Sequence, residues 1–338
     1  MMFSDRILVL GYFGYDTNQI DGQTVKTRNV YTLLNNHDLD VDYFDTQVFK
    51  RDKFQFFILL TKIFKAKKIV YLPAHNNLKF IFPLLYPLCF LMKKKIFYFV
   101  IGGWLCDFLK NKPFHKFFLK GIKGIFVETT LLKNELILKG FKNVEIIPNF
   151  KFYKQATQSV VDNHKLVFIS RINRKKGLSV LFNMIDQFGE QNNIKIDFYG
   201  PIYENDKKYF YEEIEKRDRA SYMGVLDPDS VIDTLSHYSF MVFPTEYYTE
   251  GMPGVIIDAY FANLPIVATN WLYANEFIED GKTGLISKWG DEDDFIEKVI
   301  FLINNPFKLE QFKSEINKKK YLYTDKYAWE VINKFVIR

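Results

Sequence analysis

The segment from Phe243 to Trp271, FPTEYYTEGMPGVIIDAYFANLPIVATNW, combines carboxylates with a glycine-containing loop. A strand pattern ends at Phe243, and Glu250 lies in the loop before a helical pattern that opens near Val255. The first turn of a helix offers backbone N–H groups beside the positive end of its dipole, which suits a phosphate or sugar hydroxyls. Asp258 follows Glu250 by eight residues, about two helical turns, so two carboxylates could hold two parts of one ligand. A plain strand–loop–helix unit with Asp258 in solvent explains the segment equally well.

A second segment with chemical potential is Ser170–Gly177, SRINRKKG, which directly follows another strand pattern. Arg171 and Lys176 flank its tight turn. A guanidinium fork and a compact ammonium together suit a diphosphate, although a solvated basic loop is the simpler explanation of this segment alone. Because both segments follow strands of one domain, we expect them to converge on one ligand.

Short apolar runs alternate with longer helical patterns along the whole chain, which predicts parallel strands covered on both faces and connected by helices. The predicted strands are Ile7–Leu10, Val41–Phe44, Ile69–Leu72, Ile96–Ile101, Gly124–Val127, Val144–Ile147, Leu166–Ser170, Ile194–Tyr199, Ser221–Met223, Phe240–Phe243, Ile266–Thr269 and Leu285–Ser287. The predicted helices are Thr24–Asn35, Phe54–Phe64, Leu78–Leu91, Thr130–Lys139, Gly177–Gln187, Lys207–Arg217, Asp229–Leu235, Val255–Phe261, Asp293–Ile303 and Tyr327–Ile337.

The repeated pattern predicts two doubly wound α/β domains with a cleft between them, since open α/β sheets bind ligands at the carboxyl ends of their strands. Pro148-Asn149 interrupts the pattern, and a polar stretch follows. We therefore expect a first domain over 1–150, a linker over 151–164 and a second domain over 165–324. A helix over about 325–338 would pack back on the first domain.

Length and composition exclude several classes of protein. With 338 residues, 48% hydrophobic and 25% charged, the chain has ordinary globular composition and enough length for two cores. Its two cysteines, Cys89 and Cys106, exclude a disulfide scaffold and indicate a reducing compartment. The longest apolar run, Phe80–Met92, is shorter than the roughly 20 residues of a membrane span.

The two motifs resemble those of the retaining glycosyltransferases of family four, which have the GT-B fold of two Rossmann-like domains facing a cleft. The resemblance rests on Arg171-x4-Lys176-Gly177, on Glu250-Gly251-x-Pro253 with an acid at 258, and on the run Leu264–Thr269. Within the family, Gly11–Arg28 and Ile101–Leu105 resemble bacterial capsule, exopolysaccharide or O-antigen enzymes.

The resemblance implies a nucleotide-sugar donor, with UDP or GDP as the nucleotide, and no cofactor. Arg171, Lys176 and Glu250 would be catalytic: the two cations would bind the diphosphate and stabilise it as it leaves, and Glu250 would hold the sugar hydroxyls. Asp258 stands where the family usually has Glu, and it would reach the ribose. The other donor-binding residues implied are Gly14, Val225, Gly251, Met252, Pro253, Gly254 and Val255.

On the acceptor side, the resemblance implies a Gly22–Arg28 loop and the loop around Ile101–Trp104. Many relatives have a histidine after the fourth strand of the first domain, where this chain has Gly102 and Gly103. His75 is interpreted as structural, and attack assisted by the departing phosphate would not need a separate base. The acceptor-side residues implied are Gln23, Thr24, Lys26, Arg28, Gly102 and Gly103.

Metal and dinucleotide sites are not predicted. Asp291-Glu292-Asp293 and Asp227-Pro228-Asp229 match the DxD pattern of metal-dependent sugar transferases, but both precede helical patterns and are interpreted as caps. The residues Gly11–Gly14 follow the first strand without forming GxGxxG, so they give little support to an NAD site.

Three segments of the first half are rich in lysine, over 54–68, 92–95 and 108–124, and the first and third of them also contain several phenylalanines. Residues 1–164 carry a net charge of +11, and residues 165–338 carry −5. An amphipathic helix facing the core explains the pattern, but the charge and a lipid-linked glycan acceptor favour an anionic membrane surface. We therefore expect a cytoplasmic protein, peripheral at the inner face of the plasma membrane.

Three functions stay open from the sequence. The first is a metal-independent, retaining hexosyltransferase that extends a bacterial surface polysaccharide or a lipid-linked oligosaccharide. The second is a nucleotide-sugar epimerase of the same fold, which the scarcity of histidine disfavours. The third is a non-enzymatic protein that binds membrane or nucleic acid through its basic half; it leaves the acidic half unexplained, and we expect no nucleic-acid partner.

Overall fold

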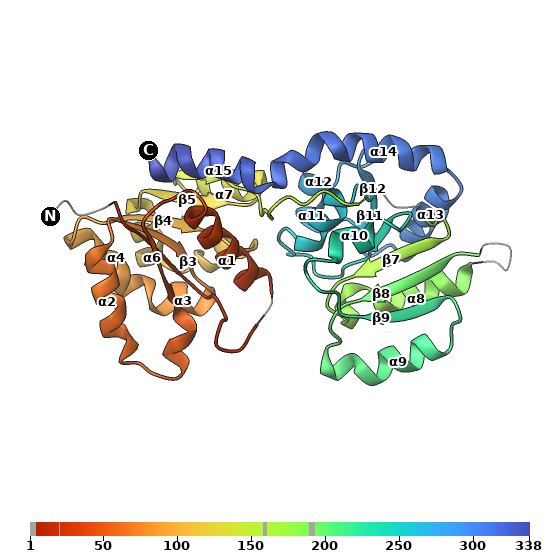
Figure 1. Ribbon diagram of the computed structural model, residues 1–338, viewed down its shortest axis with the longest axis horizontal. Coiled ribbons are helices and arrows are strands. Elements are labelled where there is room, and N and C mark those ends of the chain that lie inside the picture. Colours follow the sequence, from red (N-terminus) through yellow and green to blue (C-terminus); the bar gives the residue numbers. More distant parts are fainter. Residues whose placement is uncertain (1–4, 20, 158–160, 189–192) are drawn as a thin grey trace. The chain divides into compact units, whose positions relative to one another are not determined.

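The computed structural model describes residues 5–19, 21–157, 161–188 and 193–338. The chain divides into two compact units, one of Met1–Phe152 with Tyr323–Arg338 and one of Tyr153–Leu322 (Figure 1). The predicted linker over 151–164 includes residues 158–160, which lie outside the described part of the chain.

The first unit is built on a six-stranded parallel sheet in the order β2-β1-β3-β4-β5-β6. Its four inner strands are runs of branched and aromatic side chains that are buried on both faces, as the sequence predicts, whereas the two edge strands are partly exposed. They are β1 (Ile7–Gly11), β2 (Val41–Asp45), β3 (Lys68–Leu72), β4 (Lys95–Phe99), β5 (Gly124–Val127) and β6 (Val144–Ile146).

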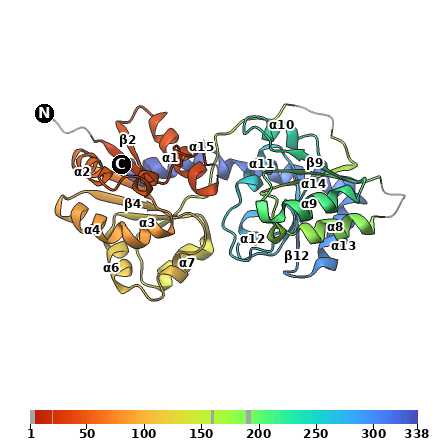
Figure 2. The ribbon, with the colours of Figure 1, turned by 90° about the horizontal axis from the view of Figure 1, so that it is seen from below.

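Helices cover both faces of the first sheet (Figures 1 and 2). One face is covered by α2 (Gln55–Lys65), α3 (His75–Phe80), α4 (Phe82–Leu91), α5 (Leu105–Phe108), α6 (Pro113–Gly121) and α7 (Thr130–Leu138), whose apolar side chains share one core. The other face is covered by α1 (Gly22–Asn35) and α15 (Asp325–Ile332) with the π-helical turn η5 (Asn333–Ile337). The 3-10 turn η1 (Thr46–Lys50) follows β2.

The helix predicted over Leu78–Leu91 is wrong as a single element. The structure has two helices there, α3 ending at Phe80 and α4 starting at Phe82. Pro83 lies in the first turn of α4, where a proline is tolerated because its missing N–H would have no partner inside the helix. The same proline could not continue α3, which explains the break.

The C-terminal segment belongs to the first unit. Asp325 N donates to Lys151 O at 3.1 Å, and Lys151 N donates to Tyr323 O at 3.1 Å, so the end of the chain runs beside residue 151. Beyond this point, Ala328, Ile332 and Val336 join the core formed with β1, α1 and β5.

The second unit has a six-stranded parallel sheet in the order β12-β11-β10-β7-β8-β9. The order reverses between β7 and β10, and such a switch point is where open α/β sheets form a crevice at the carboxyl ends of their strands. The strands are β7 (Lys165–Ile169), β8 (Lys195–Tyr199), β9 (Ala220–Gly224), β10 (Met241–Phe243), β11 (Ile266–Thr269) and β12 (Gly284–Ser287).

The helices of the second unit match most of the predicted ranges. They are α8 (Leu178–Gln187), α9 (Lys207–Glu215), α10 (Val231–Leu235), α11 (Gly254–Phe261), α12 (Ala274–Phe277), α13 (Glu292–Ile303) and α14 (Pro306–Lys319), with 3-10 turns η2 (Arg174–Lys176), η3 (Glu204–Asp206) and η4 (Lys320–Tyr323). The sequence analysis missed α14, although Leu309, Phe312 and Ile316 repeat at helical spacing and are buried.

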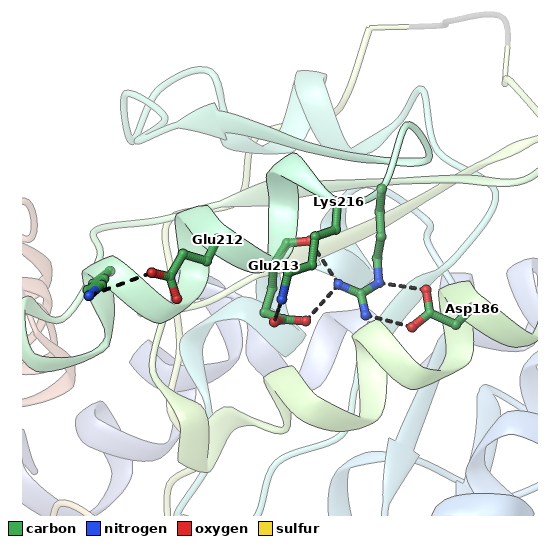
Figure 3. Close-up of polar contacts among 6 residues, drawn as sticks. Asp186, Glu212, Glu213 and Lys216 are labelled. Carbon is green, nitrogen blue, oxygen red and sulfur yellow. Dashed lines mark hydrogen bonds and ion pairs between the residues drawn. The ribbon is translucent and has the colours of Figure 1, made fainter.

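An ion-pair network ties α8 to α9 on the surface of the second unit (Figure 3). Arg217 donates to Asp186 Oδ2 at 2.6 Å and to Glu213 Oε2 at 2.7 Å. Hydrogen bonds from Lys216 and Arg217 hold the pKa of Glu213 below its usual value. The network lies away from the predicted motifs and is structural.

Candidate active site

The two predicted motifs meet at the switch point of the second sheet. The basic segment forms the loop after β7, and the Glu250 segment forms the loop after β10. Lys176 and Glu250 are 74 positions apart in the sequence, and the chain between them folds into other strands and helices, yet Lys176 Nζ and Glu250 Oε2 are in direct contact. Both side chains are largely buried, with 13% and 20% of their surface exposed.

Gly177 makes this approach possible. Its φ is +80°, and a Cβ atom built there would lie 2.0 Å from the carbonyl oxygen of Pro244. A larger residue would therefore push the loop after β7 away from the end of β10. Gly177 directly follows Lys176 and is the N-cap residue of α8.

Further contacts fix the orientation of the pair. Thr245 Oγ1 donates to Glu250 Oε2 at 3.2 Å, while Thr269 Oγ1 holds the carbonyl oxygen of Thr245 at 2.7 Å. Lys176 Nζ lies 4.8 Å from the centre of the Tyr247 ring, within the range of a cation–π interaction. An ammonium has three N–H donors, so Lys176 can bind Glu250 and still donate to an anion.

The start of α11 lies directly after this loop. Pro253 occupies the N-cap without a side-chain cap, and the helix runs from Gly254 to Phe261. Gly251, Met252 and Val255 complete the connection from Glu250 into the helix. The first backbone N–H groups of α11 are therefore available to an acceptor atom without competition from a capping side chain.

The structure corrects the spacing between Glu250 and Asp258. Because α11 begins only at Gly254, the residues from 250 to 253 are not helical, and Asp258 lies about one turn into the helix rather than two turns beyond Glu250. Asp258 is also 5% exposed, so the alternative with a solvated Asp258 is wrong.

Arg171 follows β7 and Val225 follows β9, so both lie at the same edge of the sheet, with the loop after β8 between them. Gly200, with φ of +131°, brings the loop after β8 against Ser170, since a Cβ there would lie 1.9 Å from Ser170 O. Its N–H donates to Gly224 O at 2.9 Å, so the chain before Val225 lies beside it. The Arg171 side chain is exposed, and in the described residues no hydrogen bond or ion pair joins it to Lys176 or Glu250.

In the first unit, Gly14 lies in the loop after β1 with φ of +69°. The carboxylate of Asp45, at the end of β2, accepts from Phe13 N at 3.0 Å and from Tyr15 N at 3.2 Å. The loop is therefore held in shape by its neighbouring strand. A Cβ at position 14 would lie 2.8 Å from Thr24 Cγ2, so Gly14 also permits close contact with α1.

The predicted Gly22–Arg28 loop is a helix. Asp21 caps α1 in a capping box with Thr24, so residues 22–28 form its first two turns. Gln23 Nε2 donates to Leu72 O at 3.0 Å, and Arg28 Nε donates to Phe13 O at 2.8 Å.

Lys26 is buried instead of being presented to an acceptor. Its Nζ lies 2.5 Å from Glu128 Oε1 and donates to Val100 O at 3.1 Å, and Lys26 is 1% exposed. Glu128 Oε2 accepts from Gly102 N at 3.4 Å. The pair therefore holds the start of the loop that contains Gly102 and Gly103. The sequence could not reveal this role, because Glu128 lies 102 residues away.

An open pocket of about 390 Å³, lined by residues with polar or charged groups, lies where β1 and β2 end, and the sequence analysis did not predict it. Lys50 and Arg51 supply its positive charge, and Lys50 Nζ donates to the Tyr12 hydroxyl at 3.0 Å. In the sequence, the adjacent cations Lys50 and Arg51, a few residues after the second strand, could have indicated this pocket. The lining residues are Tyr12, Thr17, Gln19, Gln47, Lys50 and Arg51.

The two DxD matches have structural roles. Asp291 caps α13 by accepting from Asp294 N at 3.0 Å, and Asp227 accepts from Asp229 N at 2.9 Å within a turn. Over the part of the chain that the structure describes, no three His, Cys, Asp or Glu side chains gather as metal ligands would.

Comparison with known proteins agrees with this geometry. Residues 163–305 match the family described as Glycosyl transferases group 1. The second unit contains a glycosyltransferase group 1 domain. Lys176, Glu250 and Asp258 all lie within the matched residues of this group 1 domain.

Two curated relatives and one solved structure extend the comparison. An uncharacterized glycosyltransferase of Methanocaldococcus jannaschii, MJ1178, is 24% identical over 66% of this chain. The capsular polysaccharide biosynthesis glycosyltransferase CapM of Staphylococcus aureus is 27% identical over 55% of it. The aligned segments span 60% and 51% of those relatives. The structure of Anabaena HepE in complex with UDP covers 97% of this chain and 98% of its own, with a TM-score of 0.78 and 14% identity, which confirms the predicted two-domain GT-B fold.

Proposed function

We propose that the protein is a retaining hexosyltransferase that moves a sugar from a UDP- or GDP-linked donor to a bacterial surface polysaccharide or a lipid-linked oligosaccharide. The observation that carries the proposal is the contact between Lys176 and Glu250 at the switch point of the group 1 domain. The name of CapM, which refers to capsular polysaccharide biosynthesis, supports the acceptor class. The UDP bound in the HepE structure supports the donor class.

In the proposed reaction, the carboxylate binds the sugar and the cations bind the diphosphate. Glu250 accepts hydrogen bonds from donor-sugar hydroxyls and orients the anomeric carbon. Lys176 and Arg171 face the diphosphate, where negative charge grows as the sugar departs, and a positioned cation stabilises that charge most strongly at the transition state. The first N–H groups of α11 donate hydrogen bonds to the remaining phosphate oxygens. These groups replace a divalent cation in this proposal, and EDTA should leave the rate unchanged.

The proposed chemical step balances without a further reactant. The bond between the anomeric carbon and the phosphate oxygen breaks, and its electron pair leaves with the nucleoside diphosphate. The acceptor oxygen bonds to the anomeric carbon from the same face, and the acceptor proton passes to a phosphate oxygen. No histidine is needed for this transfer. His75 contacts the rings of Trp104 and Phe108 at centroid distances of 5.0 and 5.2 Å, in keeping with a structural role.

On the acceptor side, we place the glycan against the ends of β1, β2 and β4. The pocket beside Lys50 and Arg51 offers cations and neutral hydrogen-bonding groups to a hydroxylated, anionic glycan. A lipid-linked acceptor places the reaction at the cytoplasmic side of the plasma membrane, with the protein bound peripherally.

The proposal is tested with a panel of UDP- and GDP-sugars. Thermal shift identifies the donor, since a ligand at 100 times its dissociation constant adds about 2.7 kcal/mol to the stability of the unit that binds it. Proton NMR of the product then gives its anomeric configuration. A glycoside with the configuration of the donor supports the proposal, and an inverted product contradicts retention. An altered nucleotide sugar without transfer would identify an epimerase instead.

A further inference from the structure

The helices on one face of the first sheet carry large apolar side chains that have no protein covering them. Phe57 and Phe64 of α2, Phe80 of α3, Leu84 and Phe90 of α4 and Phe117 of α6 are each between 62% and 70% exposed. We call the outer surface of α2, α3, α4 and α6 the lysine–aromatic face.

The four helices lie on the same face of the first sheet (Figures 1 and 2). The Tyr86 ring of α4 stacks on Phe118 of α6 at a centroid distance of 4.7 Å. Lys94, in the turn after α4, donates to the carbonyl oxygen of Phe64 at 2.7 Å and so joins the end of α2 to α4. The inner sides of all four helices share one buried core.

This region is strongly basic. Residues 53–123 contain 14 lysines and a single acidic residue, Asp107. In the described part of the chain, ion pairs engage three of these lysines, Lys62, Lys67 and Lys110. Several others lie beside the aromatic rings: Lys79 Nζ is 4.9 Å from the Phe80 ring centre, and Lys94 Nζ is 5.8 Å from that of Phe64.

We infer that the lysine–aromatic face is a docking surface for an anionic lipid bilayer. Exposed Phe and Leu side chains lose contact with water when they enter the boundary between headgroups and acyl chains, and lysines beside them bind the anionic headgroups. A nucleic acid would match the charge and its bases could stack on the rings, but it offers no apolar partner to an exposed aliphatic side chain such as Leu84. No described helix is both long and apolar enough to cross a bilayer, so the face would rest on the membrane.

This inference rests on the proposed function, because a lipid-linked acceptor is what makes membrane docking useful. The docking surface and the proposed function can be tested independently, since binding to vesicles requires neither the sugar donor nor the glycan acceptor. Binding of UDP or GDP, measured on the same preparations, shows whether the donor site in the other unit is intact.

The experiment is co-sedimentation of the full chain with vesicles of phosphatidylglycerol or of phosphatidylcholine. We expect binding to the anionic vesicles, weakened by salt, and little binding to the neutral ones. Replacing Lys116, Lys120 and Lys123 together by Gln should weaken the binding on the order of 100-fold. The matched control is the triple replacement of Lys195, Lys208 and Lys308 by Gln, which removes the same charge from the other unit.

A second pair of variants tests the apolar contribution. Phe114→Ser with Phe117→Ser should weaken binding to anionic vesicles, while Phe301→Ser with Phe307→Ser, which changes exposed rings of the other unit, should not. Equal binding to both kinds of vesicle, or binding to neither, would overturn the inference. Salt-sensitive binding that the Phe114 and Phe117 substitutions leave unchanged would also overturn it, because that result describes a polyanion site such as one for nucleic acid.

Discussion

Lys176 and Glu250 come from the loops after β7 and β10 and form a largely buried ion pair at the point where the strand order of the second sheet reverses. The two opposite charges balance each other, and Thr245 and the ring of Tyr247 fix the orientation of the pair. A cation and a carboxylate fixed at this edge of an α/β sheet can bind the two chemically different halves of a nucleotide sugar.

Lys176→Ala should weaken binding of the nucleoside diphosphate by about 10- to 100-fold, since a charged hydrogen bond contributes about 1.5–3 kcal/mol. Isothermal titration calorimetry with UDP and GDP measures the effect. The control is Lys175→Ala, which removes the neighbouring exposed lysine and should bind normally. Equal affinities for wild type and Lys176→Ala would remove Lys176 from the donor site.

Glu250→Gln should leave the affinity for the free nucleotide close to that of wild type and lower the rate of transfer on the order of 100-fold, because the carboxylate orients the sugar and not the diphosphate. Glu246→Gln, an exposed carboxylate of the same loop, is the matched control. Loss of free-nucleotide affinity as large as the loss of transfer would show that Glu250 has another role.

The buried pair of Lys26 and Glu128 makes a prediction about stability. Glu128→Leu alone leaves an uncompensated ammonium in the core and should destabilise the first unit by about 3–5 kcal/mol. The double variant Lys26→Met with Glu128→Leu should recover most of that loss, because two apolar side chains can replace a buried ion pair. Hydrogen exchange of peptides from β4 and β5 reports on this unit separately. Unchanged exchange in Glu128→Leu would contradict the stabilising role of the pair.

The two cysteines predict a pH-dependent reactivity. Burial raises the pKa of both the Cys89 and the Cys106 thiol to about 12. The reactive thiolate forms only as the pH rises toward that value, so at pH 8 alkylation of the native protein should be far slower than that of a free thiol. Mass spectrometry after iodoacetamide treatment, with and without denaturant, measures this. Rapid labelling of the native protein would show that the first core is not closed.

The sequence predicted the strands well and the side-chain partners poorly. Buried parallel strands are short apolar runs, so they are visible without tertiary information, and β5 and β11 match their predicted ranges at both ends. From the sequence, we could predict only that the segments after two strands converge on one ligand, and not that Lys176 contacts Glu250. The partner of Lys26 could not be predicted, because Glu128 lies far away along the chain. The position of Asp258 was not predicted correctly, because the residues just before Gly254 are not helical.

The most direct test of the donor-site assignment follows the sugar itself. A nucleotide sugar labelled in the sugar is incubated with a lipid-linked glycan acceptor, and the label is then measured in the acceptor fraction together with the nucleoside diphosphate released. We predict that wild type and Glu246→Gln transfer the label with equal release of nucleoside diphosphate, and that Glu250→Gln transfers on the order of 100-fold more slowly. Transfer by Glu250→Gln at the wild-type rate, or no consumption of any UDP- or GDP-sugar by the wild type, would contradict the account.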